Sequence, residues 1–322
     1  MSGLDARALR YFVGIVTEGS ITRAAEQLNV AQPALSLQVK KLEAVLGTEL
    51  LHRTARGVTP TEAGLRLLDY ARDILKLMES AREELRSAAS EPIGDVSLGL
   101  PQSVSMVLTV PLVETVLATM PKVRLHVVEA MTGYIPGWLR SGHLDLGMLF
   151  RSSDATGLVT RRFLDESLYV VGPPGAFPVA GRKGAYRCGS VPFSTLGGLP
   201  LIAPGRPHGL RDLVDEAARS QGVELHPIVE VDAIAPMLEL TARGVGHCVL
   251  SYAVVRGAIE EGRVSAARLV DPPIRRSIFI CRAADAPISR ASREVEALAC
   301  RLMAELVTSG LWSADLAGDA TP

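Results

Sequence analysis

Polar side chains that could contact DNA recur at helical spacing near the N-terminus. Gln32, Ser36 and Lys40 follow an i, i+4, i+8 pattern, and Leu37 lies beside them. At 3.6 residues per turn, such a row lies along one face of a helix. Amide, hydroxyl and ammonium groups on a helix can contact base edges in the major groove and pair with phosphates. The same pattern is typical of a solvated polar face, and the spacing alone favours neither interpretation.

Three short helices are the elements that must position this polar face. Apolar residues at 3–4 spacing predict helices over residues 4–17 and 21–28, and Ser20 is a good N-cap for the second. Pro33 suits the first turn of a third helix. The core face of that third helix is expected to consist of Leu35, Val39, Leu42 and Leu46. Short helices joined by a tight turn predict a helix-turn-helix.

An arginine-bearing turn and a long helix follow. Residues 49–58 predict two short strands around Arg53 and Arg56, a wing that could set both guanidinium groups against the DNA backbone or minor groove. Thr59-Pro60-Thr61-Glu62 predicts a capping box at the start of a helix that runs to about residue 89. Its apolar seam comprises Leu65, Leu68, Ala71 or Arg72, Leu75, Met78, Ala81 or Arg82, and Leu85. Such a seam is typical of a dimer helix, and the alternative is packing onto its own domain.

From residue 92 onward, short apolar runs alternate with helical stretches. Strands are expected near 96–100, 123–129, 144–150, 169–172, 199–203, 227–231, 247–250 and 277–281. Helices are expected at 103–120, 133–141, 210–221, 233–243 and 289–308. This alternation predicts parallel sheets with right-handed crossovers in two lobes. The chain is expected to cross between the lobes near 164–169 and 267–272, and residues 314–322 to form a loose tail.

Polar residues at the ends of these strands predict a ligand site between the lobes. In open α/β sheets ligands bind at the carboxyl ends of strands, beside helix N-termini that favour anions. The candidates are Gln102, Ser103, Thr132, Arg151 and His208, which suit a small carboxylate. Each has a simpler interpretation: Ser103 and Thr132 could cap helices, Arg151 could be a surface residue, and His208 could be a loop histidine.

Composition excludes several classes of protein. With 48% hydrophobic and 21% charged residues, the chain is not globally disordered. Its net charge of −1 gives no support for nucleic-acid binding, although residues 1–60 carry seven Lys and Arg against five Asp and Glu. No run of about 18 apolar residues and no leader pattern is visible, so we expect a cytoplasmic protein without a membrane span.

Motifs of catalysis and metal binding are missing as well. The chain contains no G-x-S-x-G, H-E-x-x-H or Walker sequence, and its six histidines show no metal spacing. We therefore expect no catalytic residues, metal or cofactor. The four cysteines form no C-x-x-C pair, which argues against a disulfide framework. Cys248 is expected to be a buried apolar thiol, with a redox sensor as the alternative.

Several stretches of the first 64 residues resemble one family. They include Gly19-Ser20-Ile21-Thr22-Arg23-Ala24-Ala25-Glu26-Gln27-Leu28, Ala31-Gln32-Pro33-Ala34-Leu35-Ser36 and Arg56-Gly57-Val58-Thr59-Pro60-Thr61-Glu62-Ala63-Gly64. These stretches resemble the LysR-type transcriptional regulators, and the last two are most similar to the nitrogen-assimilation-control branch.

The resemblance implies an α+β multidomain protein. Its expected parts are a winged helix-turn-helix DNA-binding domain at 1–60, a linker and dimerisation helix at 61–91, an effector-binding domain at 92–310 and a tail at 311–322. The effector-binding domain would be a two-lobed α/β structure like a periplasmic binding protein. Its lobe I would comprise residues 92–165 and 269–310, and its lobe II residues 166–268.

The same resemblance implies a sequence-specific transcription factor, not an enzyme. Promoter DNA, RNA polymerase and further copies of the chain in a homotetramer, a dimer of dimers, are the expected partners. Residues expected to approach the major groove are Gln32, Pro33, Ser36, Leu37 and Lys40, with Arg53 and Arg56 on phosphates. Where the family often has an arginine or glutamine this chain has Leu37, which can contact a thymine methyl but not guanine in a bidentate way.

A small anionic effector would modulate this regulator. In the family, positions matching Ser103, Thr132 and Arg151 commonly line the effector pocket. Some members of the nitrogen-control branch work without a co-inducer. The alternative is therefore a cleft that binds no ligand. A cytoplasmic solute-binding protein that does not bind DNA is the alternative from another functional class.

Overall fold

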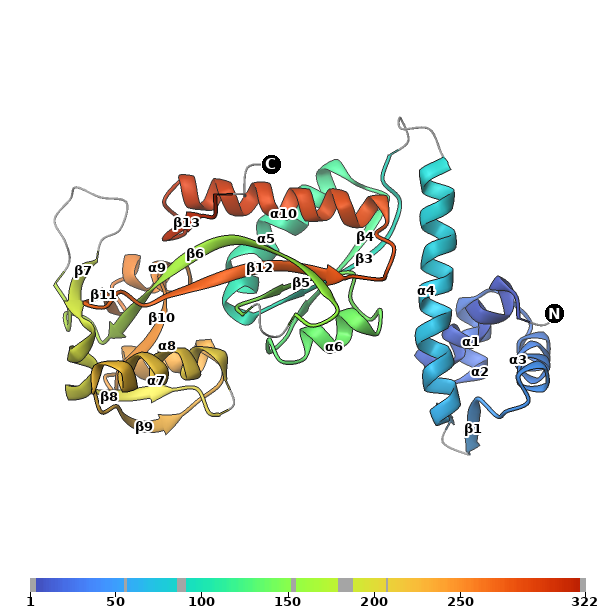
Figure 1. Ribbon diagram of the computed structural model, residues 1–322, viewed down its shortest axis with the longest axis horizontal. Coiled ribbons are helices and arrows are strands. Elements are labelled where there is room, and N and C mark those ends of the chain that lie inside the picture. Colours follow the sequence, from blue (N-terminus) through green and yellow to red (C-terminus); the bar gives the residue numbers. More distant parts are fainter. Residues whose placement is uncertain are drawn as a thin grey trace. The chain divides into compact units, whose positions relative to one another are not determined.

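The computed structural model describes residues 4–54, 57–85, 91–151, 155–178, 188–206 and 208–318. The chain forms two compact units (Figure 1). The first contains Met1–Glu91, and the second contains Pro92–Arg140, Leu144–Ala284 and Ala291–Pro322.

The N-terminal unit is a winged helix-turn-helix. Its elements are α1 (Ala6–Glu18), α2 (Ile21–Gln27), α3 (Gln32–Leu46), β1 (Leu51–Thr54), β2 (Gly57–Pro60) and α4 (Glu62–Leu85). β1 and β2 pair in antiparallel fashion as the predicted wing. The core is built from apolar residues of every element: Ala8, Tyr11, Phe12, Ile15, Ala24, Ala25, Leu35, Val39, Leu42, Leu50, Leu51, Val58 and Leu68.

Local signals set the boundaries of the first three helices. The Asp5 carboxylate accepts a hydrogen bond from the Ala8 amide, and Ser20 Oγ accepts one from the Arg23 amide, so both side chains act as N-caps. α3 begins after Ala31 without a side-chain cap. The predicted core face of α3 is confirmed except at Leu46, which is 38% exposed because the helix ends there in a left-handed Gly47.

The expected capping box at the start of α4 is wrong in its register. Pro60 pairs with Leu51 inside β2, so it belongs to the wing and not to the first helical turn. The N-cap role falls to Thr61, whose Oγ1 accepts from the Gly64 amide at 3.0 Å and donates to the Glu49 carbonyl at 2.8 Å. The helix therefore begins at Glu62.

The apolar seam of α4 is divided between two surroundings. Leu68 and Ala71 are buried in the N-terminal unit, where α4 packs against α1. This part follows the alternative interpretation of packing onto its own domain. Other apolar side chains of the helix are exposed. Tyr70, Ile74, Leu77 and Met78 follow helical spacing and form an exposed apolar stripe, while Leu65 is exposed elsewhere on the helix.

The second unit is built on one large mixed sheet. In its described residues nine strands form this sheet, seven of them in the order β4 (Val123–Glu129), β3 (Gly94–Leu100), β5 (Leu146–Leu149), β12 (Arg275–Ala283), β6 (Leu158–Gly172), β11 (Ser265–Val270) and β7 (Gly189–Pro192). β10 (Cys248–Ser251) and β13 (Ala314–Leu316) also pair with β6. A small parallel sheet consists of β8 (Pro200–Ala203) and β9 (His226–Glu230).

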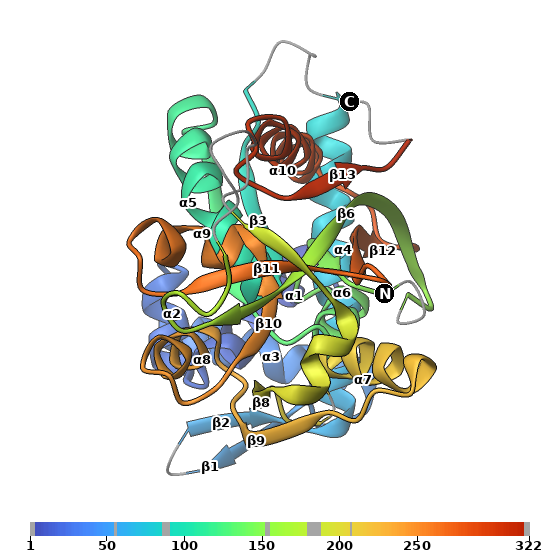
Figure 2. The same cartoon turned by 90° about the vertical axis from the view of Figure 1, so that its left-hand side faces the viewer.

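Helices cover this framework. They are α5 (Gln102–Thr119), α6 (Ile135–Arg140), the 3₁₀ helix η2 (Phe193–Gly198), α7 (Gly209–Gln221), α8 (Ile234–Ala242), α9 (Tyr252–Glu260) and α10 (Arg290–Thr308). α10 and α6 lie on opposite sides of β12 (Figures 1 and 2). β7, η2 and α9 were not predicted from the sequence, and β11 lies where a crossing was expected.

Two long neighbouring strands join the two lobes of this unit (Figure 1). Residues 158–167 of β6 pair with β12 in lobe I, and its last residues pair with β10 and β11 in lobe II. These pairings are antiparallel, so the expectation of parallel sheets holds only for β3 with β4 and β5, β7 with β11, and β8 with β9. The short strand expected at 169–172 is the end of the longer β6.

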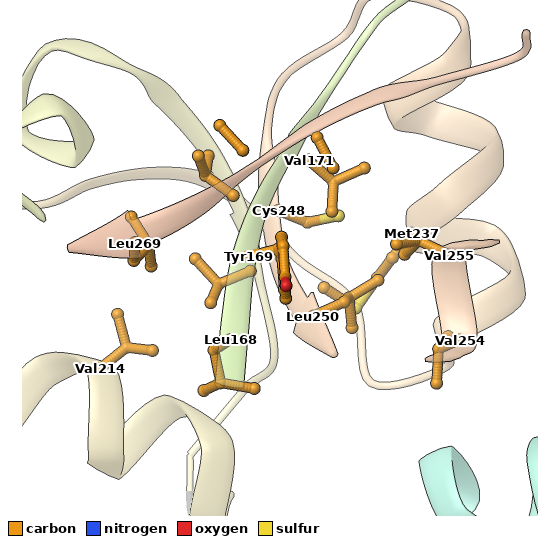
Figure 3. Close-up of a cluster of buried hydrophobic side chains, with 14 of the residues drawn as sticks. Leu168, Tyr169, Val171, Val214, Met237, Cys248, Leu250, Val254, Val255 and Leu269 are labelled. Atoms are coloured by element: carbon orange, nitrogen blue, oxygen red, sulfur yellow. The ribbon is translucent and has the colours of Figure 1, made fainter. Parts of the chain in front are cut away.

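The core of lobe II gathers around the end of β6. Figure 3 shows Leu168, Tyr169 and Val171 of β6 among side chains from the neighbouring strands and helices. Cys248 of β10 is fully buried there, and its sulfur accepts a hydrogen bond from the Thr241 hydroxyl. Burial raises the pKa of the Cys248 thiol to about 12. The prediction of a buried apolar thiol is confirmed.

The expected loose tail is wrong in its first part. Trp312 is buried, and Ala314–Leu316 forms β13 against residues 164–166 of β6. This strand was not predicted from the sequence because its partner lies about 150 residues earlier in the chain.

α5 is the one helix among the described residues that is long and apolar enough to span a membrane by length and composition. No such run was expected from the sequence. One side of α5 packs inside the second unit, where Val104, Leu108, Leu112 and Val116 are buried. This packing accounts for the buried side of α5, whereas Met106, Val110 and Leu117 on the rest of the helix are exposed.

Gly64 provides a test of the packing between α4 and the wing. A Cβ at this helical position would lie 2.1 Å from the Leu50 carbonyl oxygen, whereas a Cβ at the helical Gly137 would meet nothing within 4 Å. Helix propensity alone would make both Gly→Ala changes stabilising. We expect Gly64→Ala instead to destabilise the N-terminal unit by about 1–3 kcal/mol through overpacking.

Both tryptophans lie in the second unit, so hydrogen exchange with mass spectrometry is the suitable measurement. Peptides from residues 50–70 should exchange at least about fivefold faster in Gly64→Ala. Gly137→Ala should not accelerate exchange in residues 133–141. Equal protection of residues 50–70 in Gly64→Ala and the unmodified chain would contradict the close approach.

Candidate nucleic-acid interface and ligand site

The exposed side of α3 carries the predicted DNA contacts. Gln32, Pro33, Leu37 and Lys40 are exposed there, and Ser36 is half-buried. Leu37 is 54% exposed, so this aliphatic side chain has no place in the core. The helical spacing of these five residues brings them to one surface. That surface offers an amide, a hydroxyl, an ammonium group and an apolar contact to a partner.

The wing and α3 are joined by side chains. The Arg53 guanidinium donates from Nη1 to Ser36 Oγ at 3.2 Å, and its Nη2 lies 3.9 Å from Glu43 Oε2. Glu43 Oε1 also accepts hydrogen bonds from the Leu50 and Leu51 amides at 2.9 and 3.3 Å. The Glu43 carboxylate therefore ties α3 to the first wing strand. Arg56 lies outside the described residues.

The role of Glu43 was not predicted from the sequence. The one available signal is an acidic residue shortly after two lysines on the helix expected to contact DNA. Its partners are backbone amides beyond the end of that helix, which a helical repeat does not reveal.

In the second unit, Gln102 and Ser103 begin α5 at the carboxyl end of β3. Gln102 Oε1 accepts a hydrogen bond from the Ile234 amide at 3.1 Å, so a lobe I side chain caps α8 of lobe II. Ser103 is nearly buried, and its Oγ accepts from Arg276 Nη2 at 2.8 Å. Both side chains thus bond to groups outside their own helix.

Arg276 forms a buried ion pair that was not anticipated from the sequence. Its Nε donates to Glu166 Oε1 at 2.5 Å, and its Cζ lies 3.7 Å from the centre of the Phe150 ring. Trp312 Nε1 donates to the second oxygen of Glu166 at 2.8 Å. Arg276 and Glu166 are opposite each other in the β6–β12 register. A buried pair with this many hydrogen bonds satisfies both charges.

His208 caps the start of α7, and Thr132 lies near the glycine that follows it. His208 is the N-cap of this helix, because its Nδ1 accepts from the Leu210 amide at 3.2 Å. Burial lowers the pKa of His208, and the Arg276 charge lowers it further, while Asp232 and Asp212 raise it. The lowered pKa favours the neutral imidazole, which agrees with Nδ1 accepting a hydrogen bond. Thr132 Oγ1 lies 3.9 Å from where a Cβ on Gly209 would stand.

Neighbouring groups link three of the five expected ligand residues. Ser103 bonds to Arg276, whose charge acts on His208, and His208 precedes Gly209, which lies next to Thr132. Gln102 is next to Ser103 in the chain and bonds to the Ile234 amide. Arg151 is half-buried, and within the described residues no hydrogen bond or ion pair joins it to the other four.

The arrangement can bind an anion without using a buried charge. Ser103 Oγ accepts from Arg276, so its own proton stays available for donation. Because His208 accepts at Nδ1, the proton of its neutral ring is on Nε2, which can donate as well. Two polar donors from different lobes suit a small carboxylate.

Comparison with known proteins identifies the family. Residues 6–65 match the model for bacterial regulatory helix-turn-helix proteins of the lysR family, and residues 89–302 match the LysR substrate binding domain. The nitrogen assimilation regulatory protein nac of Klebsiella aerogenes is 33% identical over 93% of this chain and 95% of its own length. The nac protein of Escherichia coli is 32% identical over 92% and 94%.

Solved structures show the same architecture. A full-length OxyR variant from Pseudomonas aeruginosa has a TM-score of 0.74 and 26% identity, covering 93% of this chain and 98% of its own. Full-length CbnR in complex with its target DNA has a TM-score of 0.60 at 22% identity, covering 95% and 100%, and this likeness shows the fold.

These matches extend over both units. The resemblance to the nitrogen-assimilation-control branch is confirmed by the two nac proteins, and the relatives are regulators of transcription and not enzymes. The chain belongs to the LysR family of DNA-binding transcriptional regulators.

Proposed function

We propose that this regulator binds promoter DNA through α3 and its wing, and that a small carboxylate between the effector lobes modulates this binding. The observation that supports DNA binding through α3 and the wing is the hydrogen bond between Ser36 and Arg53. It holds a wing cation beside the exposed polar side of α3. A guanidinium placed in advance loses less side-chain freedom when it meets a phosphate.

Each residue of this surface has a role by its chemistry. Gln32 and Ser36 can bond to base edges, and Leu37 can contact a thymine methyl. Pro33 opens the helix that enters the groove, while Lys40 and Arg53 meet phosphates. Arg56 is assigned to the phosphates from the sequence alone.

Assembly and partners follow the family. The solved CbnR structure contains its target DNA, and we extend promoter binding to this chain. The exposed apolar stripe of α4 supports pairing of two copies, and we expect effector domains to join dimers into a tetramer. We further propose that the protein contacts RNA polymerase and acts in the cytoplasm, where promoters lie.

The proposed effector site comprises Gln102, Ser103, Thr132 and His208, with Arg151 retained as an expectation from the sequence. Donors from Ser103 and His208 belong to different lobes, so a carboxylate bound by both would hold the lobes together. We propose that this change alters the relative angle of the paired DNA-binding units.

Lys40→Ala tests the phosphate contact. Losing one such contact should weaken binding and lower the slope of log K against log salt concentration by about 0.9. The measurement is fluorescence anisotropy of the full chain with DNA from upstream of its own gene. Arg243→Ala is the control, because it removes an equal charge from the C-terminal end of α8, where Arg243 pairs with Glu239. A slope in Lys40→Ala equal to that of the control would refute the assignment.

A double-mutant cycle tests the link between α3 and the wing. Ser36→Ala and Arg53→Gln should each weaken binding of the same DNA, and the double variant should lose less than both losses combined. The expected coupling is about 0.5–1 kcal/mol, because each single change already disrupts the shared hydrogen bond. Strictly additive losses would mean that Arg53 acts independently of Ser36 on DNA.

Ser103→Ala tests the effector site. Thermal-shift screening of the full chain against small carboxylates should give at least one stabilising compound, and Ser103→Ala should lose that response. Ser105→Ala is the matched control, because Ser105 bonds to Thr109 on the same helix. No stabilising carboxylate in a broad panel would contradict the proposal and favour a regulator that works without an effector.

A further inference from the structure

A cavity lies where the two lobes join, on the side of β6 opposite the buried ion pair. Its volume is about 430 Å³, and it is lined by residues of β6, β11, β12, β13 and the link before β12. Ser167 and Arg275 line it and pair in the strand register. Their neighbours Glu166 and Arg276 form the next pair. Successive strand residues point to opposite faces, so this cavity is distinct from the proposed effector site.

Two of the four charged residues in this cavity already neutralise each other. Arg275 forms an ion pair with Asp315 and donates to the Asp165 carbonyl at 3.2 Å. Arg268 and Asp271 also line the cavity and are exposed. Among the described residues, neither of these two side chains has a hydrogen-bond or ion-pair partner. The cavity thus offers one cation and one carboxylate for a ligand.

The remaining lining residues are small or apolar. Ser167 is half-buried and adds a hydroxyl, while Ser313 Oγ is bonded to the Tyr169 hydroxyl. Val270, Pro273 and Ala314 form an apolar wall. A complementary ligand needs a negative group for Arg268, a positive group for Asp271 and an apolar part for this wall.

We propose that this cavity binds a zwitterionic α-amino acid with an apolar side chain. Its carboxylate pairs with Arg268, its ammonium group with Asp271, and its side chain packs on Val270, Pro273 and Ala314. The cavity is built by the crossing of β6, the link between β11 and β12, and the C-terminal β13. Its occupant therefore joins segments of both lobes. This inference goes beyond the proposed function and does not depend on it.

Isothermal titration calorimetry of the full chain tests the ligand class with three matched probes. L-leucine carries both charges, 4-methylpentanoate only the carboxylate and 3-methylbutylamine only the ammonium group. We expect L-leucine to bind at least about tenfold more tightly than either analogue, since each analogue leaves one charged side chain unpaired. No L-leucine binding at millimolar concentration, or equal binding of 4-methylpentanoate that persists in Ser103→Ala, overturns the proposal.

Variants locate the site. Arg268→Gln and Asp271→Asn should each weaken L-leucine binding by about tenfold or more. Arg263→Gln is the control, because Arg263 is an exposed residue of the same lobe that pairs with Glu261 outside the cavity. Ser103→Ala should also leave L-leucine binding unchanged. Binding that survives both cavity variants, or that is lost in Ser103→Ala, places the ligand elsewhere and overturns the proposal.

Discussion

The second unit depends on the pairing of β6 with β12, because these strands carry the chain from one lobe to the other. Near one end of that pairing, next to the Arg275–Ser167 pair, Glu166 and Arg276 face each other as a buried ion pair. Removing one partner of such a pair leaves an uncompensated charge, at a cost of about 3–5 kcal/mol. The hydrogen bonds from Trp312 and to Ser103 keep both charges satisfied. This constraint holds the crossing in one register.

The places of both proposed ligand sites follow from this register. Since side chains alternate along a strand, Glu166 and Arg276 face the start of α5, while Ser167 and Arg275 face the cavity on the other side. Trp312 and β13 close the crossing on the other edge of β6. A ligand bound on either face would therefore contact elements that the crossing strands hold together. Its binding would act directly on how the two lobes are arranged.

The N-terminal unit depends on a similar contact between distant segments. Glu43 binds the amides of Leu50 and Leu51, and the Leu50 carbonyl lies so close to Gly64 that no side chain fits there. The wing is thus held between α3 and α4. Arg53 then lies beside Ser36, where a cation can extend the polar side of α3.

The sequence by itself determined the local features of this protein. Ser20, Pro33 and the repeat of Leu35, Val39 and Leu42 define helices because capping and periodic burial act over a few residues. The family resemblance, carried by contiguous motifs, added the fold of both units and the function. Gln102, Ser103, Thr132 and His208 could be proposed from the sequence because strand ends and helix starts lie close together in the chain.

Only the tertiary structure decided which distant groups meet. Arg276 pairs with Glu166 across 110 residues, and Trp312 reaches Glu166 across 146. Neither contact leaves a pattern in a local window, because strand register depends on the packing of the whole sheet. The hydrogen bond between Arg53 and Ser36 also depends on the packing of distant segments, and so does the cavity that Arg268 and Asp271 line. The local sequence shows which groups can bind DNA or a ligand. Long-range packing determines which of these groups lie close enough to act together.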